Sequence, residues 1–333
     1  MKVLITGANG FLGRATVRSF LDAGHEVRAL VRPTAPGEET WAGRVEVVRA
    51  DLRAGRSLES AVDGVDAVIH IAAGTSGDDA DMFAATVIGT ERLLAAMAST
   101  PTRRLVLASS FTVYDWDAIP YLLTESSPLA TNLERRGGYP AAKVWQERVT
   151  RRMSAEHGLD LTVLRPGVIW GRGNEYPPGI AQQLGPVHLV FGRAARLPLT
   201  YVENCAEAFV RVTEHPRSAG QTFNVVDDAG TPTAAFIREH LRRSGAGGVT
   251  LAIPYGLSEG MVRAVSRTSE RLFGRPGHLP SILVPERFVA RFKPLDYSND
   301  KLRESVGWGP RYSLREALDR TYGPAEDWVP SKS

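Results

Sequence analysis

Cysteine is almost absent from this chain of 333 residues, because Cys205 is the only one. A single thiol cannot form an internal disulfide, so a disulfide-stapled scaffold is excluded and a cytoplasmic location is expected. The seven histidines show no metal-ligand spacing, and no cysteine pair accompanies them. We therefore expect no metal site.

Long apolar runs are also missing, and none approaches the roughly 20 residues that a membrane span needs. Met1 leads directly into an apolar pattern at 2–6, so we expect no signal peptide. The formal net charge is only +3, and arginines are mixed with acidic residues along the whole chain. This mixing is typical of a solvated surface and does not favour a nucleic-acid partner.

What the sequence does contain is an alternation of short apolar runs with longer amphipathic ones. Apolar strands that alternate with helices predict a parallel sheet covered by helices on both faces, a doubly wound α/β fold. The expected strands are 2–6, 25–32, 44–52, 65–73, 103–110 and 159–171, and the expected helices are 11–24, 82–99 and 138–158. In such sheets the ligand lies beyond the carboxyl ends of the strands.

The alternation breaks down after about residue 171, where proline and glycine become more frequent. We expect residues 1–171 to form a dinucleotide-binding domain and residues 172–330 to form mainly a smaller substrate-binding lobe and lid. The expected elements are a loop and helix at 174–192, segments near 199–228 that return to the sheet (with a helix at 204–215), a helix at 231–245 and a loose tail at 326–333. The basic, amphipathic segment 255–293 is interpreted as a lid with an apolar inner face, and an interfacial membrane patch is the alternative.

The segment "ITGANGFLGRA" places Gly7, Gly10 and Gly13 between the first strand and the first helix. Gly7 permits a tight turn, Gly10 lets the backbone approach a pyrophosphate, and Gly13 lets helix and strand pack closely. The N–H groups at the start of the helix then face the phosphates. The spacing and position predict a dinucleotide site of the Rossmann type.

The end of the second strand bears on which dinucleotide is bound. An NAD enzyme usually carries an acidic residue there for the ribose hydroxyls, but this chain has Val31 followed by Arg32. An arginine can pair with a 2′-phosphate, which a carboxylate would repel. We therefore favour NADP(H), with NAD(H) as the alternative, and we expect Asp51 to contact the adenine amino group.

Two tyrosine–lysine pairs have the same spacing, Tyr139–Lys143 in "GYPAAK" and Tyr297–Lys301 in "DYSNDK". On a helix, residues four apart lie on one face, where a lysine can lower the pKa of a tyrosine that acts as an acid or base. Spacing alone does not choose between the two pairs.

The order of the motifs along the chain distinguishes the two pairs. "TGANGFLG" (6–13), "VIHIAA" (68–73), "SSFTVY" (109–114), "YPAAK" (139–143) and "RPGVIWG" (165–171) together resemble the extended short-chain dehydrogenase/reductase family, and further matches extend over most of the chain. The resemblance implies that Tyr139 is the acid/base, that Lys143 supports it and holds the nicotinamide ribose, and that Ser110 binds the substrate oxygen with help from Thr112. It implies a structural role for Tyr297–Lys301. The cofactor-binding residues it implies are Gly7, Asn9, Gly10, Phe11, Leu12, Gly13, Arg32, Asp51, Leu52, Ala72, Ala73, Lys143, Pro166 and Val168.

Departures from the family pattern narrow the expected reaction. Phe111 and Thr112 follow Ser110, where dehydratases and decarboxylases of the family carry an acidic residue. Leu197 stands where sugar-nucleotide members usually carry a diphosphate-binding arginine; if such a substrate were bound, Arg172, Arg193 or Arg196 would have to replace it. These features favour hydride transfer between a nicotinamide and a secondary alcohol or ketone on a small or hydrophobic substrate without a nucleotide.

Two other hypotheses stay open: a sugar-nucleotide epimerase that oxidises and re-reduces its substrate, and a cofactor-binding regulator without catalysis. The resemblance also implies a homodimer formed through the helices expected at 82–99 and 138–158.

Overall fold

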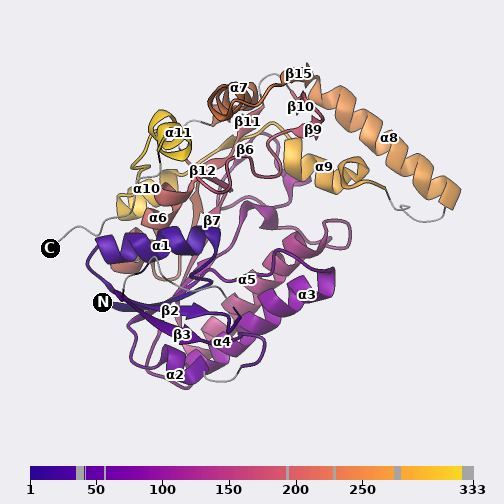
Figure 1. Ribbon diagram of the computed structural model, residues 1–333. Helices are drawn as coiled ribbons and strands as arrows, with labels where there is room; N and C mark the ends of the chain where they lie inside the picture. Colours follow the sequence, from indigo (N-terminus) through magenta and orange to yellow (C-terminus); the bar gives the residue numbers. More distant parts are fainter. Residues whose placement is uncertain are drawn as a thin grey trace.

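A seven-stranded sheet forms the centre of the protein (Figure 1). The computed structural model describes residues 1–34, 41, 43–55, 58–192, 195–227, 230–273 and 279–324. The strand order is β13-β7-β5-β4-β1-β2-β3, and every pairing within the sheet is parallel. The strands are β1 (Lys2–Thr6), β2 (Glu26–Val31), β3 (Val45–Arg49), β4 (Ala67–His70), β5 (Arg104–Ala108), β7 (Asp160–Pro166) and β13 (Thr222–Val225). The predicted doubly wound parallel sheet is confirmed.

Helices cover both faces of this sheet because successive strand side chains point to opposite sides. Val3 and Ile5 of β1 belong to one apolar core, which includes residues of α1 and α6, whereas Leu4 belongs to a second core under α2 and α4. The helices around the sheet are α1 (Phe11–Asp22), α2 (Leu58–Val62), α4 (Gly89–Ala98), α5 (Gly138–His157) and α6 (Val202–Glu214). Helix α6 and strand β13 come from the second half of the chain, so this half returns to the sheet.

The helix expected at 82–99 is interrupted. It begins as α3 (Asp79–Phe83), continues through one π-helical turn (Ala84–Ile88) and becomes α4. Within the π turn, the Thr86 hydroxyl accepts a hydrogen bond of 2.9 Å from the backbone N–H of Gly74. The turn therefore ties this helix to the loop that follows β4, at the carboxyl edge of the sheet.

The helix expected within 174–192 is wrong, because the described chain forms a β-hairpin there. Strands β9 (Gln182–Leu184) and β10 (Val187–Phe191) pair antiparallel, and β15 (Val249–Ile253) adds to β10. Gly185, with a φ of 56°, provides the left-handed conformation in the two-residue turn. Along Val187–Val190 burial alternates, with His188 and Val190 buried, which is the period of a strand.

The segment expected as a lid contains α8 (Tyr255–Phe273) and α9 (Pro285–Phe292), separated in part by residues outside the described chain. Helix α9 packs its Phe288 and Phe292 against Phe191, with ring centroids 5.0 and 4.6 Å apart. Most of the buried apolar residues of this segment are on α9, whereas three of the four buried residues of α8 are serines and its large side chains Leu257 and Met261 are exposed.

Short elements complete the C-terminal half and the loops. They are β6 (Leu122–Leu123), β8 (Val168–Trp170), β11 (Arg196–Leu197), β12 (Leu199–Tyr201), β14 (Thr231–Pro232), β16 (Asp296–Tyr297), α7 (Thr233–Ser244), α10 (Asp300–Val306) and α11 (Leu314–Tyr322). The tail predicted at 326–333 lies outside the described residues. Among the described helices, none combines the length and the apolar character that a membrane crossing requires.

Candidate active site

A cavity of about 1400 Å³ lies at the carboxyl ends of the central strands and extends under α9. Every site residue expected from the sequence lines this one cavity. The lining includes Gly7, Asn9, Gly10, Phe11, Leu12, Gly13, Arg32, Asp51, Leu52, Ala72, Ala73, Ser110, Thr112, Tyr139, Lys143, Pro166 and Val168. Residues from seven separate segments of the chain thus meet in a single space.

The glycine turn has no room for side chains. A Cβ on Gly13 would lie 2.0 Å from the carbonyl oxygen of Gly7, and a Cβ on Gly7 would lie 2.9 Å from the Ala72 backbone. Gly7 also has a φ of 68°. Helix α1 starts after Gly10 with no side-chain cap and no acidic residue in its first turn. Its first N–H groups are therefore available to a phosphate, as a dinucleotide site requires.

At the same carboxyl edge of the sheet, beyond β2, Arg32 is exposed on the cavity wall. Asp51 is held by Arg53, whose backbone N–H donates to its carboxylate at 2.8 Å and whose guanidinium donates at 2.9 Å. These hydrogen bonds hold the pKa of the Asp51 carboxyl below its ordinary value. Arg53 also lines the cavity, although the sequence analysis did not single it out; its position two residues after Asp51 was the available signal.

Tyr139 is the second residue of α5, and two glycines determine where this helix begins. Gly137 has a φ of 90°, and a Cβ on Gly138 would lie 2.4 Å from a carboxylate oxygen of Asp79. The pKa of Tyr139 is raised to about 12 because the phenol is buried, although a hydrogen bond with Ser110 acts in the opposite direction. The protein alone thus shifts this pKa upward, contrary to the lowering that we expected from Lys143.

Lys143 lies one turn further along α5 and is buried. Its ammonium group donates to the carbonyl oxygen of Ala108 at 2.8 Å and to the side-chain oxygen of Gln146 at 2.9 Å. Burial lowers the pKa of Lys143 to about 7, and the nearby Glu147 carboxylate opposes the shift. A group with this pKa changes charge readily near neutral pH when an anion binds beside it.

Gln146 connects Lys143 to a buried polar chain that the sequence analysis missed. The Thr90 hydroxyl donates to the carbonyl oxygen of Thr86 at 2.5 Å, so it accepts from His70, 2.8 Å away. The other ring nitrogen of His70 then accepts from Thr6 at 2.7 Å. Burial, and then the charge of Lys143, lower the pKa of His70 to about 3, so this histidine stays neutral. Gln146, whose oxygen accepts from Lys143, joins this chain by donating its side-chain N–H to the Thr90 hydroxyl at 3.0 Å.

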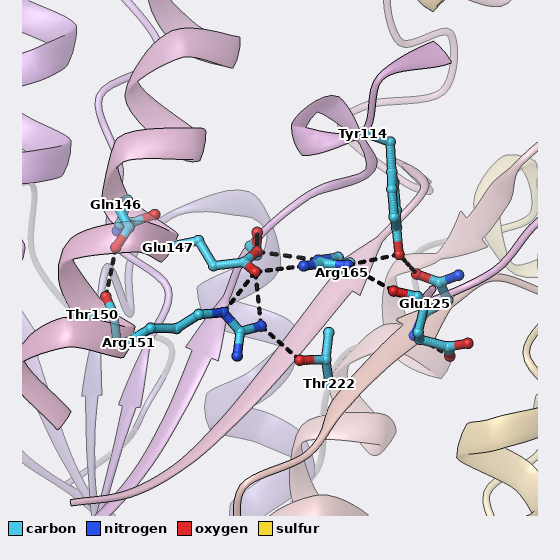
Figure 2. A network of polar contacts seen from close by, with 10 residues as sticks. Tyr114, Glu125, Gln146, Glu147, Thr150, Arg151, Arg165 and Thr222 are labelled. Atoms are coloured by element: carbon cyan, nitrogen blue, oxygen red, sulfur yellow. Dashed lines mark hydrogen bonds and ion pairs between the residues drawn. The ribbon is translucent and has the colours of Figure 1, made fainter. Parts of the chain in front are cut away.

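A second network, drawn in Figure 2, fixes α5 against the sheet. Glu147 of α5 accepts hydrogen bonds from Arg165 of β7 at 2.5 and 3.1 Å and from the Ser109 hydroxyl at 2.7 Å. Arg165 also donates to the hydroxyl of Tyr114 at 3.0 Å. Burial alone would raise the pKa of Glu147, but Arg165 holds it at about 2. This ion pair links the helix of Tyr139 to the strand that ends at the cavity.

The second tyrosine–lysine pair is separated by the fold. Tyr297 stacks on Phe111 with ring centroids 5.9 Å apart and lines the cavity, but Lys301 lies over the ring of Phe223 and is not part of the cavity wall.

Thr112, beside Phe111, carries a buried hydroxyl oxygen without a hydrogen-bond partner in the described chain. It is thus available to a bound molecule.

The residues considered for a substrate diphosphate lie apart from each other. Leu197 is buried in the cavity wall, and Arg196 donates to the carbonyl oxygen of Gly230 and pairs with Asp296 at 3.4 Å. Arg172 instead binds carbonyl oxygens near the end of α11 and does not line the cavity. Arg193 lies outside the described residues.

The part of the cavity beyond Tyr139 is largely apolar. The side chains that line it come from the hairpin, from α9 and from the loops after β5 and β8, and they include Phe111, Trp116, Ile169, Pro177, Ile180, Val190, Phe191, Leu197, Ala290 and Phe292. Such a surface suits a hydrophobic substrate.

Comparison with known proteins agrees with this geometry. The model of the NAD dependent epimerase/dehydratase family matches residues 3–225, so the chain belongs to this family. It is an extended short-chain dehydrogenase/reductase, as the motif order predicted.

Two curated relatives cover nearly the whole chain. One is a 2-alkyl-3-oxoalkanoate reductase of Stenotrophomonas maltophilia, 29% identical over 96% of this chain and 98% of the relative. Another is a 3 beta-hydroxysteroid dehydrogenase/Delta 5-->4-isomerase of Mycobacterium tuberculosis, 29% identical over 95% of this chain and 88% of the relative. Among solved structures, the UDP-glucuronic acid 4-epimerase of Bacillus cereus, in complex with UDP-glucuronic acid and NAD, has a TM-score of 0.70 at 18% identity, covering 97% of this chain and 98% of that one. This last similarity shows the shared fold.

Proposed function

We propose that the protein is an NADPH-dependent reductase of a ketone on a hydrophobic molecule without a nucleotide. The observation that carries the proposal is the single cavity that joins the glycine turn and Arg32 to Ser110, Tyr139 and Lys143. The two curated relatives described above act, by their names, on an oxoalkanoate and on a steroid, and both are oxidoreductases.

The residues of the cavity fit a nicotinamide dinucleotide. The glycine turn and the start of α1 accept the pyrophosphate, Asp51 faces the adenosine end, and Arg32 binds the 2′-phosphate that distinguishes NADP(H). Lys143 holds the nicotinamide ribose from the opposite side. When bound, the reduced nicotinamide supplies the hydride that the carbonyl carbon of the substrate accepts.

The protein supplies the proton. Ser110 and Thr112 hydrogen-bond the carbonyl oxygen of the substrate, and the Tyr139 hydroxyl transfers its proton to that oxygen as the alcohol forms. A pKa raised to about 12 keeps Tyr139 protonated at neutral pH, which is the form required for reduction. The polar chain through Gln146 positions Lys143. The positive charge of the protonated Lys143 then stabilises the phenolate that remains on Tyr139.

Sugar-nucleotide epimerisation is the less favoured function, since apolar Leu197 lines the cavity where the family usually places a diphosphate-binding arginine.

Residues 1–171, with the returning segments near 199–228, form the cofactor-binding domain in this proposal, and residues 172–330 mainly form the substrate lobe and lid. The cytoplasmic location and a homodimer through the helices at 82–99 and 138–158 stay predictions from the sequence.

The test is NADPH oxidation with a panel of alkyl ketones, 3-oxo acids and 3-oxosteroids, using the wild-type protein and Tyr139→Phe. A general acid commonly contributes ~10²–10⁴ in rate, so the variant should lose at least about 100-fold in kcat while it still binds NADPH. Tyr322→Phe is a matched control, because this tyrosine bonds His240 and does not line the cavity.

Tyr297→Phe distinguishes the two motifs. The stacking on Phe111 survives the loss of the hydroxyl, so turnover should stay within about threefold, as for most substitutions that leave the chemistry untouched. An inactive Tyr297→Phe together with an active Tyr139→Phe would refute the assignment. Absence of NADPH oxidation with every ketone of the panel would refute the reductase itself.

A further inference from the structure

Among the described residues that line the substrate end of the cavity, the charged side chains are all basic. Among the described residues, the acidic side chains that line the cavity are Asp51 and Asp81, and both interact with Arg53 at the adenosine end. Beyond Tyr139 the charged lining residues are Arg136, Arg196, Arg287, Arg291 and Lys293. Some of them already have protein partners, since Arg196 pairs with Asp296 and Lys293 donates to the carbonyl oxygen of Trp116.

Arg136 is the most unusual member of this group. It stands three residues before Tyr139, and only 9% of its surface is exposed. Its Nη1 atom is buried without a hydrogen-bond partner in the described part of the chain. A buried guanidinium that lacks a direct ion pair is costly, because its lost hydration is not replaced. A buried guanidinium of this kind is expected where a bound ligand supplies the missing hydrogen-bond acceptor.

The neighbouring Arg135 shows the contrast within the same sequence. It forms ion pairs with Glu270 of α8 and with Glu286 of α9, the latter at 3.3 Å. Burial lowers the pKa of Arg136, and three acidic residues oppose this only through longer-range attraction: Asp115, Asp117 and Glu286. Of these, Asp117 is already paired with Arg263 at 2.6 Å and Glu286 with Arg135. Arg136 thus lines a small side pocket with Asp115, Asp117 and Glu286, yet its Nη1 atom has no hydrogen-bond partner in the described chain.

A second arginine lies beside the same helix start. The guanidinium of Arg287 is 3.5 Å from the position that a Cβ on Gly137 would take, and its Nε donates to the carbonyl oxygen of Arg135 at 3.0 Å. Arg136 and Arg287 therefore both line the cavity that contains Tyr139, the tyrosine proposed to protonate the substrate. The surrounding wall is apolar, so an anion here would belong to a molecule with a hydrophobic remainder.

We propose that Arg136 binds a carboxylate of the substrate close to the reacting carbonyl, so that the preferred substrates are hydrophobic 3-oxo acids. This inference rests on the proposed ketone reductase. In the reaction, the hydride adds to the ketone carbon, the Tyr139 proton adds to its oxygen, and the carboxylate stays unchanged in contact with the guanidinium. The product is the 3-hydroxy acid, and one NADPH is oxidised for each ketone reduced.

The first experiment compares kcat/KM for freshly prepared 2-methyl-3-oxodecanoate, its methyl ester and 3-decanone, which lacks the carboxylate. One charge-assisted hydrogen bond commonly gives about 10- to 100-fold in affinity or rate, so the wild type should prefer the acid over the ester by about that factor. Arg136→Gln should abolish the preference while its kcat/KM for the ester stays within about threefold. Arg136→Lys should keep part of the preference, because it retains a charge but loses the fork geometry.

Arg267→Gln is the control, since Arg267 lies exposed on α8 and does not line the cavity. Equal wild-type rates with the acid and the ester would overturn the proposal, and so would an Arg136→Gln variant that loses the acid and the ester equally. Reduction of the ester without preference for the acid refutes only the carboxylate site. Failure to reduce any of the three compounds refutes the reductase.

A binding measurement separates the site from turnover. Decanoate, which has no ketone, should bind the complex of the wild-type protein with NADP+ about 10-fold more tightly than the same complex of Arg136→Gln, as measured by calorimetric titration. Removal of an unpaired buried charge should also leave the melting temperature of Arg136→Gln equal to or above that of the wild type. Equal decanoate binding by both proteins, or a variant that melts well below the wild type, contradicts the assignment.

Discussion

Glu147→Gln tests the ion pair that anchors α5, because it removes the carboxylate charge and keeps the shape of the side chain. Glu147 and Arg165 are both almost fully buried, with 3% and 4% of their side chains exposed. The substitution leaves the Arg165 guanidinium buried beside the Tyr114 hydroxyl without a counter-charge. Breaking a buried pair in this way commonly costs about 3–5 kcal/mol.

The pKa of Glu147 gives an independent magnitude. Its lowering from 4.5 to about 2 corresponds to about 3 kcal/mol of folding free energy. Since the folded-state pKa is depressed, this contribution is fully present above pH 4.5 and is lost as the pH falls towards 2. At pH 7 we expect a loss of about 3 kcal/mol, which for a chain of 333 residues lowers the melting temperature by roughly 4 °C.

The assay is urea denaturation of the wild type and of Glu147→Gln at pH 7, 5, 4 and 3.5. The difference in unfolding free energy should be largest at pH 5–7 and should shrink below pH 4.5. The double variant with Arg165→Met should recover part of the loss, because an apolar replacement of both partners is often neutral. A difference below 1 kcal/mol at pH 7, or one that is constant down to pH 3.5, would refute the role assigned to the pair.

Three further predictions concern the cofactor and the substrate. Arg32→Ala should weaken NADP(H) at least 10-fold and leave NAD(H) nearly unchanged, since a charged hydrogen bond to the 2′-phosphate is lost; equal effects in fluorescence titrations would contradict the NADP(H) assignment. UDP-, GDP- and dTDP-sugars should not shift the melting temperature of the cofactor complex, because Leu197 replaces the expected arginine; saturable stabilisation at micromolar concentrations would favour the epimerase. Burial lowers the pKa of Lys143 to about 7, so its destabilising effect is full below pH 7 and is relieved as the pH rises towards 10.5. The stability of the wild type relative to Lys143→Met should therefore increase between pH 7 and 10, and a stability difference that does not change with pH would contradict this. The wild type should also bind the cofactor more tightly than Lys143→Met does.

Local patterns in the sequence were sufficient for the central sheet, because its strands are short, apolar and separated by amphipathic helices. They failed at 174–192, where "QQLGPVHLVF" has a strand period that is easily taken for a short helix. They also did not separate α9, which buries apolar side chains, from α8, because the burial of a helix depends on which distant element packs against it. The cavity residues of the glycine turn and of α5 could be named in advance because each belongs to a local motif.

Other parts of the site follow only from tertiary contacts. Gln146 joins Lys143 to His70, and these two residues are 73 positions apart in the chain. Glu147 and Arg165 look like ordinary surface charges in the sequence, and only the packing of α5 against β7 brings them together. No motif marks Arg136 either, because an arginine before a helix is usually solvated; the burial of its Nη1 atom without a hydrogen-bond partner is a property of the described fold.

Lys143 and Arg136 place two cationic side chains in the same cavity, and neither has a carboxylate as a direct hydrogen-bond partner in the described chain. Elsewhere in the interior the protein pairs its charges, as Arg165 does with Glu147. The difference has a physical reason: a cofactor and an anionic substrate bring their own negative charge, and a protein carboxylate at either position would compete with them. The free site is thus less stable than it could be, and ligand binding should recover that stability. On this argument, the wild-type melting temperature should rise more with NADP+ and decanoate together than with NADP+ alone.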